Sequence, residues 1–259
     1  MHDTAFEIGR KFFALYVSGI QPSILDVGSQ NVNGSLRECA PAGSRYMGVD
    51  LAAGPGVDIV LDDPNALPFK TGRFDAVITT SCFEHAQMFW LTFLEMARVT
   101  RRGGYIYINA PSNGVYHSYP YDNWRFYPDA GLALVAWAAD QQIKLTLVES
   151  FIAPRKADIW NDCVIVLRKG PAQADDLPRK RLADLVRGAV NIRRHGTPGT
   201  LKATAPTQDM LLLHQANDRL ASLQSEITRL KQALSRSRKD IKALKAQLGR
   251  RKPTARKPQ

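Results

Sequence analysis

The sequence predicts an α/β fold with a doubly wound, mostly parallel sheet of seven strands, followed by an α-helical coiled coil. Short apolar runs alternate with helix-length segments as far as residue 168, which is typical of parallel strands joined by right-handed crossovers and covered by helices on both faces. Polar residues follow several of these runs, at the edge where such sheets bind their ligands. A seven-residue repeat of Leu and Ile over residues 213–248 predicts the coiled coil.

The elements of the sheet domain follow one another in a regular order. Residues 3–19 are expected to form an amphipathic helix, and the strand-like runs are SILDV, RYMGVD, VDIVL, FDAVITTS, YIYINAP, KLTLVES and DCVIVLRK. The segment FWLTFLEMARVT predicts a helix that ends at two arginines and two glycines, which suit the negative end and the exit turn of a helix. Residues 128–139 predict another helix. The last two strands are close enough in sequence to pair antiparallel.

The composition divides the chain into four parts. Residues 1–168 form the predicted sheet domain, 169–208 a basic linker with an amphipathic helix at 177–195, 209–249 the coiled coil, and 250–259 a disordered basic tail. The net charge of +11 is unevenly distributed, since residues 1–167 have a net charge of −4 and residues 168–259 one of +15. The basic half therefore needs an explanation separate from that of the sheet domain.

The repeat over residues 213–248 has apolar residues at both core positions of the heptad. Position a is occupied by Leu213, Leu220, Ile227, Leu234, Ile241 and Leu248, and position d by Ala216, Leu223, Leu230, Ser237 and Leu244. The alternative is one helix folded back on the globular core, but so narrow a stripe with polar flanks would cover a core poorly. We expect a homo-oligomer, and the mixture of Leu and Ile permits dimers, trimers or tetramers.

The cysteines and the apolar runs indicate a cytoplasmic protein. Cys39, Cys82 and Cys163 lie far apart and fit neither a disulfide framework nor a zinc spacing, so we expect a reducing compartment and no bound metal. The apolar run at residues 12–20 follows acidic residues and lacks a small-residue cleavage pattern, unlike a signal sequence. No stretch approaches the roughly 20 apolar residues of a membrane span.

The basic helix predicted at residues 177–195 suggests peripheral contact with an anionic surface at the inner membrane face. Such helices lie on anionic lipid when one of their faces is apolar, and the apolar residues here are Leu182, Leu185, Val186, Ala189 and Val190. The alternative is a solvated linker whose charge only aids solubility.

Acidic residues follow the first three strands of the predicted sheet. Asp26 precedes Gly28, Asp50 ends the second run, and Asp62 and Asp63 end the third. Carboxylates at these positions argue against a phosphate-rich ligand, which needs glycines, a helix N-terminus and often a Lys. A carboxylate after the second strand suits a ribose diol, and one after the third suits an adenine amino group. The expected ligand therefore contains adenine and ribose and has positive charge instead of phosphate.

Five motifs resemble those of one enzyme family, in the family's order. ILDVGS, GVDL, DDPNALPF, GRFDAVITTSCFEH and MARVTRRGGYIYINAPS are similar to the motifs of class I S-adenosylmethionine-dependent methyltransferases, a Rossmann-like family, and in particular to the subfamily with LPF and EH signatures. The resemblance covers residues 20–168. It implies S-adenosylmethionine as cofactor, with the methionine part at Asp26, Gly28 and Ser29, the ribose at Asp50, the adenine at Leu51 and at Asp63 or Asp62, and the sulfonium beside Ser81 and Cys82.

The first loop departs from the pattern of this family, which usually shows GxGxG. Only Gly28 remains, and Gly34 is the next glycine. A positive backbone φ is least costly for Gly, and Asn is the next most tolerant residue. We therefore expect Asn31 and Asn33 to occupy turn positions, with Gly34 closing the loop.

The segment from Pro111 to Asp129, which we call the Tyr-rich loop, is the expected acceptor side of the site. A hydroxyl acceptor must lose a proton, and the proposed bases are His117, Asp122 and, in the EH signature, His85. The side chains that would stack on or hydrogen-bond a sugar or another polar ring are Tyr119, Tyr121, Trp124 and Arg125. The alternatives are that Trp124, Arg125 and Phe126 only lock the loop and that His85 is structural. We interpret His2, His195 and His214 as solvated surface residues.

The sequence motif HSYPYDNWRFYPD is similar to one found in bacterial methyltransferases of surface-polysaccharide and related glycan pathways. This resemblance implies O-methylation of a glycan or of a sugar-containing acceptor. A coiled-coil scaffold with a methyltransferase-like domain is the alternative. Nucleic-acid methylation is ranked lower, because the basic tail lacks interleaved aromatics and the sheet domain is acidic.

Overall fold

The computed structural model describes residues 2–250 of the 259-residue chain. By its internal contacts the chain separates into two compact units, Met1–Thr204 and Ala205–Gln259. The unit boundary therefore lies after Thr204, beyond the boundary at residue 168 that the composition suggested. The basic tail predicted at 250–259 lies outside the described residues, except for Arg250 at the end of the last helix.

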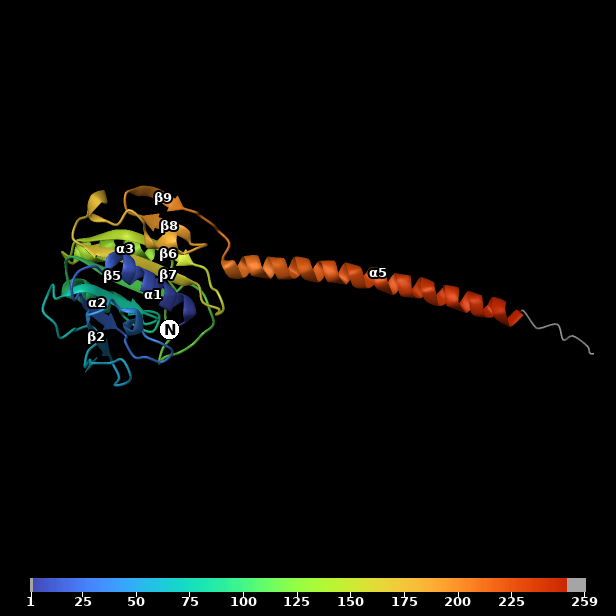
Figure 1. The fold of residues 1–259 in the computed structure, drawn as a ribbon, viewed down its shortest axis with the longest axis horizontal. Helices are drawn as coiled ribbons and strands as arrows, with labels where there is room; N and C mark the ends of the chain where they lie inside the picture. The colour runs from blue at the N-terminus through green and yellow to red at the C-terminus, as the bar shows by residue number, and fades with distance from the viewer. Residues whose placement is uncertain (1, 251–259) are drawn as a thin grey trace, which may run out of the picture. The chain divides into compact units, whose positions relative to one another are not determined.

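The first unit is built on one mixed sheet of nine strands, where we predicted a mostly parallel sheet of seven (Figure 1). Their order is β3-β2-β1-β4-β5-β7-β6-β8-β9. The pairings from β3 to β5 are parallel and those from β5 to β9 are antiparallel, including the predicted pair β6–β7. The strands are β1 (Ser23–Val27), β2 (Arg45–Asp50), β3 (Ile59–Val60), β4 (Phe74–Thr80), β5 (Thr100–Pro111), β6 (Leu145–Ala153), β7 (Asp162–Lys169), β8 (Val190–Arg194) and β9 (Thr197–Leu201).

Two apolar clusters lie on opposite faces of this sheet. Ile24 and Leu25 are neighbours on β1 but belong to different clusters, because side chains alternate along a strand. Helices α1 (Asp3–Tyr16) and α4 (Leu182–Leu185) contribute to the cluster of Ile24. Helices α2 (Phe89–Val99) and α3 (Ala130–Asp140) contribute to the cluster of Leu25. Two 3-10 helices, η1 (Leu36–Cys39) and η2 (Ala174–Asp176), complete the unit.

The basic amphipathic helix predicted at residues 177–195 is wrong. Only α4 forms there, followed by β8, which adds to the edge of β6. Gly188 has a φ of 83°, which L side chains rarely adopt and which ends any helix before β8. Three of the five residues proposed to lie on lipid belong to the core instead, since Leu182, Val186 and Ala189 are buried, whereas Leu185 is 38% exposed. The apolar face that motivated membrane contact is therefore not available on the surface.

A buried carboxylate fixes this segment to the rest of the unit. Glu149 on β6 accepts hydrogen bonds from the backbone N–H groups of Leu182 (2.7 Å) and Ala183 (3.0 Å) at the start of α4. It also accepts one from the Tyr16 hydroxyl at the end of α1. Burial raises the pKa of the Glu149 carboxyl, because the charged form loses its hydration. These three bonds join α1, β6 and α4, which explains why residues after 168 remain part of the same unit.

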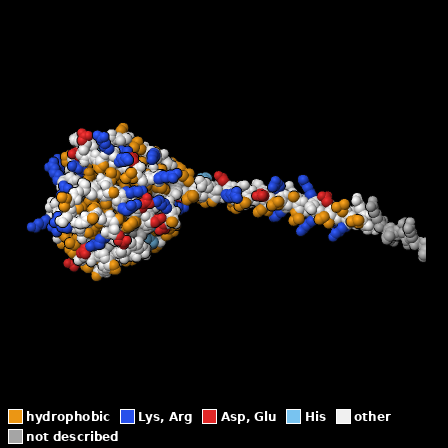
Figure 2. All heavy atoms as spheres, in the orientation of Figure 1, with side chains coloured by type: hydrophobic (Ala, Val, Ile, Leu, Met, Phe, Trp, Pro, Cys, Tyr) orange, Lys and Arg blue, Asp and Glu red, His pale blue; other side chains and the backbone are white. Residues whose placement is uncertain are grey.

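The second unit is dominated by one helix, α5 (Gln208–Arg250), of 43 residues, which is about 65 Å long at 1.5 Å per residue. Its apolar side chains are exposed, as Figure 2 shows between patches of Lys and Arg. Leu220, Ile227 and Leu234, three of the predicted core positions, are each at least half exposed. The long helix that the repeat predicted is therefore present, whereas pairing with a second copy stays a prediction.

Within residues 2–250, none of the helices combines the length and the apolar composition that a membrane span requires.

Candidate functional site

A cavity of about 900 Å³ opens at the carboxyl ends of β1, β2 and β4, where the strand order of the sheet reverses. Most of the predicted site residues line it, namely Asp26, Gly28, Ser29, Asp50, Leu51, Ser81, Cys82, His85, His117, Tyr119 and Tyr121. Five predicted residues do not: Asp62, Asp63, Asp122, Trp124 and Arg125. Eleven of the sixteen predicted site residues therefore lie on the wall of this cavity, and their roles stay a prediction.

The loop after β1 wraps one end of the cavity. The N–H groups of Gly28 and Ser29 both donate to the Val49 carbonyl of β2, at 2.9 and 3.1 Å, which fixes the turn. Gly28 has a φ of 80°, and a Cβ atom there would lie 2.6 Å from Sγ of Cys82. Any larger residue at position 28 would therefore strain the backbone and collide with the end of β4.

Gly34, with a φ of 107°, closes this loop as expected, but the asparagines act differently from our prediction. Neither Asn31 nor Asn33 has a positive φ. Instead, the Asn31 side-chain oxygen accepts a hydrogen bond from the N–H of Gly34 at 2.7 Å. Short polar side chains commonly stabilise turns in this way. The asparagine therefore shapes the loop through its side chain and not through its backbone.

Two carboxylates of the cavity wall come from the ends of β1 and β2. Asp50 Oδ2 accepts from the N–H of Gln30 at 3.0 Å, and its Oδ1 accepts from the N–H of Leu51 at 2.7 Å, so the side chain is held in one orientation. Asp26 is buried and accepts a hydrogen bond from the Tyr46 hydroxyl at 2.6 Å. Burial raises the pKa of Asp26 to about 6.

The segment after β3 approaches the cavity through residues other than the predicted acids. Leu61, Pro64 and Asn65 line the cavity. Asp63 Oδ1 instead accepts a hydrogen bond from the N–H of Asn65 at 2.8 Å. Asp63 therefore shapes the turn that brings Asn65 to the wall, a relation that strand spacing alone could not reveal.

The end of β4 is strained where the reacting part of a cofactor is expected. Ser81 has a φ of 50°, which costs energy in a residue other than Gly and is found disproportionately at functional sites. Its N–H donates to the Asn109 carbonyl of β5 at 2.9 Å. Burial raises the pKa of the neighbouring Cys82 thiol to about 12, so Cys82 presents a neutral thiol.

The Tyr-rich loop divides into a part that lines the cavity and a part that fixes the loop. His117, Tyr119 and Tyr121 line the cavity, and the Tyr119 hydroxyl donates to the side-chain oxygen of Gln30 at 3.0 Å. The loop thereby contacts the loop that follows β1.

Trp124, Arg125 and Asp122 belong to the fixing part. Trp124 Nε1 donates to the Ala86 carbonyl at 2.9 Å, and its ring packs against Phe89. Arg125 donates through both terminal nitrogens to Asp122, at 2.5 and 2.8 Å. This ion pair holds the pKa of the Asp122 carboxyl well below its usual range, so Asp122 is a weak proton acceptor.

Glu84 and His2 line the cavity as well, although neither was predicted as a site residue. Glu84 is 1% exposed, and burial raises its pKa to about 8; its position beside His85 in the EH motif was the available signal. His2 is not a solvated surface residue as we expected. It lines the cavity, and its Nε2 lies 2.6 Å from Oδ1 of buried Asp162. No signal in the sequence connects these two residues, which are 160 positions apart.

The polar composition of the cavity fits a cationic ligand without phosphate. Among the described residues that line it are four carboxyl side chains, on Asp26, Asp50, Glu84 and Asp158, and no Lys or Arg. The Ser29 and Thr80 hydroxyls line the same wall, are buried, and have no hydrogen-bond partner within the described part of the chain. Unpartnered buried hydroxyls are costly, and a polar ligand would satisfy them.

Comparison with known proteins agrees with this description. Residues 25–108 match the family model described as "Methyltransferase domain". A comparison with curated proteins found no match.

Several solved structures are similar to this chain at low sequence identity. The 1,6-didemethyltoxoflavin-N1-methyltransferase of Burkholderia thailandensis, solved with S-adenosylhomocysteine, has 16% identity, a TM-score of 0.49, and covers 64% of this chain and 79% of its own. The YcgJ protein of Bacillus subtilis has 11% identity and a TM-score of 0.48, and the match covers 66% of this chain and 100% of that protein. The cyclase SpnF has 11% identity and a TM-score of 0.48, and the match covers 64% of this chain and 82% of that protein. Because these TM-scores are below 0.5, the assignment depends on the family model and not on these neighbours.

Proposed function

We propose that this chain is an S-adenosylmethionine-dependent methyltransferase that methylates a hydroxyl group of a glycan or of another sugar-containing acceptor, since residues 25–108 match the model of a methyltransferase domain. The observation behind the proposal is the acceptor side of the cavity, which is formed by His117, Tyr119 and Tyr121 of one loop together with Trp160. Aromatic faces and polar edges suit the apolar face and the hydroxyls of a sugar ring.

The cofactor half is assigned by matching charge and position. Asp50 accepts hydrogen bonds from the ribose hydroxyls, and Leu51, Pro64 and Asn65 surround the adenine. Asp26, Gly28 and Ser29 hold the methionine part, with the Asp26 carboxylate near its ammonium group. Ser81, whose backbone N–H is held by the Asn109 carbonyl, borders the sulfonium together with the neutral Cys82 thiol. This assignment is consistent with the absence of Lys and Arg from the described wall.

The bound cofactor supplies an activated methyl group, so the protein's main task is to position the acceptor. The acceptor O–H and the sulfur–methyl bond break, an oxygen–methyl bond forms, and one proton leaves. His85 and His117 lie on the acceptor side, with ring centroids 4.9 Å apart, and assist the loss of that proton. Asp122 is excluded from this role by its ion pair with Arg125.

Cofactor binding is expected to weaken about tenfold between pH 7 and pH 5. The buried Asp26 has a pKa of about 6, with Tyr46, Arg37 and Asp50 as its polar neighbours. Its folded pKa is raised, so it is protonated below pH 6 and loses its attraction for a cationic cofactor. The measurement is calorimetry across this range, with Asp26→Asn as the control, because that variant lacks the titrating charge. An equal pH dependence in both proteins would contradict the role of Asp26.

The acceptor class is tested by transfer of labelled methyl groups from S-adenosylmethionine. The full chain is incubated with nucleotide sugars, extracted bacterial glycan, total RNA and nitrogen heterocycles in parallel. Label is expected in carbohydrate, at alkali-stable O-methyl positions. Label only in RNA or only in heterocycles would overturn the glycan assignment while leaving the methyltransferase assignment intact.

Self-association through residues 213–248 is a second proposal, favoured by the exposed Leu and Ile positions of α5. Such assembly would place several catalytic units on one coiled coil, as a scaffold does. A nucleic-acid substrate is less favoured, because the described cavity wall contains no cationic side chain to contact phosphate.

A further inference from the structure

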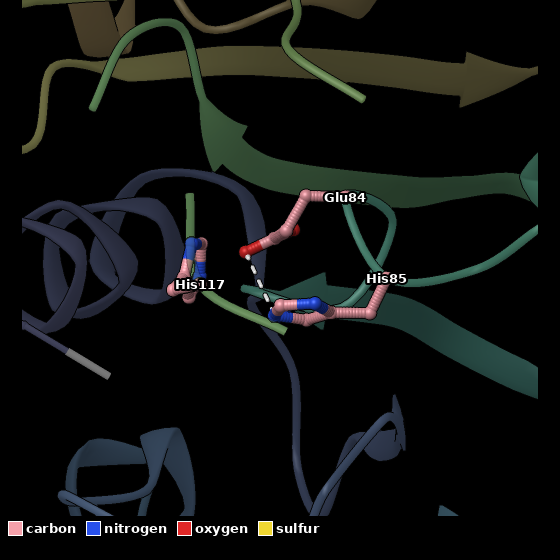
Figure 3. A group of neighbouring side chains, drawn as sticks. All are labelled: Glu84, His85 and His117. Atoms are coloured by element: carbon pink, nitrogen blue, oxygen red, sulfur yellow. Dashed lines mark ion pairs between the residues drawn. The ribbon is translucent and has the colours of Figure 1, made fainter. Parts of the chain in front are cut away.

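Three side chains converge on one point of the cavity wall. Glu84 and His85 follow β4, and His117 comes from the Tyr-rich loop (Figure 3). Each offers one ligand atom, and these atoms lie within 4.8 Å of one another. His85 Nε2 and Glu84 Oε1 are 3.8 Å apart. Ligand atoms that share a metal ion at about 2.1 Å are about 3.0–3.5 Å apart, so a contraction of no more than about 1.8 Å between any two of these atoms would complete the site.

The hydrogen bonds of both imidazoles select the tautomer that a metal ligand needs. His85 Nδ1 is 2.6 Å from the Tyr121 carbonyl oxygen, which only accepts. Nδ1 therefore bears the hydrogen, and Nε2 of the neutral ring keeps its lone pair. His117 Nδ1 lies 3.4 Å from the Val115 carbonyl and 3.4 Å from Asp122 Oδ2. Both are acceptors, so Nδ1 of His117 also bears the hydrogen and its Nε2 keeps the lone pair. Metal-bound histidines usually donate their other nitrogen to a carbonyl or carboxylate in this way.

Glu84 provides an independent indication of a ligand. It is 1% exposed, and its Oε2 has no hydrogen-bond partner within residues 2–250. A buried carboxylate without a partner is costly unless a cation or a donor compensates it. Among the described residues that line this wall there is no Lys or Arg. A bound metal ion would supply the missing positive charge at the one place where both imidazole lone pairs are also available.

We propose that Glu84, His85 and His117 bind one divalent first-row transition-metal ion, with zinc the best fit. Two imidazoles and one carboxylate favour such an ion over Mg²⁺ or Ca²⁺, which prefer oxygen ligands. The proposal departs from our expectation of no metal, which considered cysteine spacing. Three protein ligands leave a coordination position open toward the cavity, as catalytic zinc sites do.

The role of this ion rests on the proposed O-methylation, because an acceptor hydroxyl is the group that would occupy the open position. Coordination orients the acceptor oxygen and lowers the pKa of its proton, which then passes to water in the cavity. His85 and His117 thus assist the proton loss as metal ligands and not as bases. Binding of the metal itself does not depend on the identity of the acceptor.

The test is titration of the full chain, freed of metal by chelation, with Co²⁺, followed by its visible absorption and reversed by Zn²⁺. One equivalent per chain is expected to bind, and Glu84→Gln and His117→Gln are each expected to weaken binding at least tenfold. His214→Gln is the matched control, because His214 is exposed on α5, and it should leave binding unchanged.

Wild-type protein that binds no Co²⁺, or ligand variants that bind it as the wild type does, would overturn the proposal. Thermal melting and S-adenosylmethionine calorimetry check that each variant is folded. His117 provides a second test should Glu84→Gln fail to fold, because His117 lies on a loop and is partly exposed. Since the titration contains no acceptor, failure to methylate carbohydrate would not alter its outcome, and loss of metal binding would not decide the acceptor class.

Discussion

Replacing Asp50 by alanine is expected to weaken the binding of S-adenosylmethionine about 100-fold. The Asp50 carboxylate is held by the N–H groups of Gln30 and Leu51 at the end of β2 and lines the cavity. In the proposed complex it accepts two ribose hydroxyl hydrogen bonds. A hydrogen bond to a charged group contributes about 1.5 kcal/mol or more, and a loss of about 3 kcal/mol corresponds to about 100-fold in affinity. Calorimetry with the two purified proteins measures this difference.

The matched control is Asp140→Ala. Asp140 is an exposed carboxylate at the end of α3 and is not part of the cavity wall, so the same change of charge there should alter affinity less than twofold. Thermal melting of both variants separates loss of binding from loss of fold. Unchanged affinity in Asp50→Ala would show that ribose is not recognised at β2, and the assignment of the whole cofactor half would then be wrong.

Strand positions and the polar residues that end them could be predicted because they depend on local sequence. The runs that became β1, β2 and β4 are apolar and bounded by turn residues, and the crevice of such a sheet lies at their carboxyl ends whatever the side chains are. Asp26, Asp50 and Ser81 were therefore placed correctly on the cavity wall.

The segment 177–201 was mispredicted because its apolar residues satisfy two patterns. Leu182, Val186 and Ala189 have helical spacing, but they are buried by contact with the sheet and α1, which no local pattern encodes. The hairpin signal was present at His195 and Gly196 between β8 and β9, where Gly196 has a φ of 72°. Contact with the free edge of β6 outweighed the helical preference.

Residues distant in sequence account for the other omissions. His2 and Asp162 meet only because α1 packs on the sheet and brings the N-terminal end beside β7. The roles of Trp124 and Arg125 depend on contacts with Ala86 and Asp122, and their residue types suit binding and locking equally well. The sequence therefore left these alternatives open, and the geometry favours locking.

The largest expected effect concerns the association of α5. We propose a second copy as the partner of the exposed stripe of Leu and Ile, because the same heptad positions would recur on both chains. In a parallel pair Glu226 and Asp240 at g would face Lys231 and Lys245 at e. Replacing Leu230, a d residue that is 55% exposed in the single chain, by aspartate should weaken association about 10³-fold. Two lost leucines contribute about 2 kcal/mol each, which corresponds to that factor.

Sedimentation velocity measures this change in self-association, with the wild type and Leu230→Asp compared over the same range of micromolar concentrations. The control is Gln232→Asp, which adds the same charge two residues away at the outer f position of the same heptad and should leave the oligomer intact. Because both changes affect the helix propensity of α5 similarly, a difference between them reports on the d position alone. A monomeric wild type, or equal dissociation in both variants, would contradict assembly through this stripe, and the apolar residues of α5 would then require a different partner.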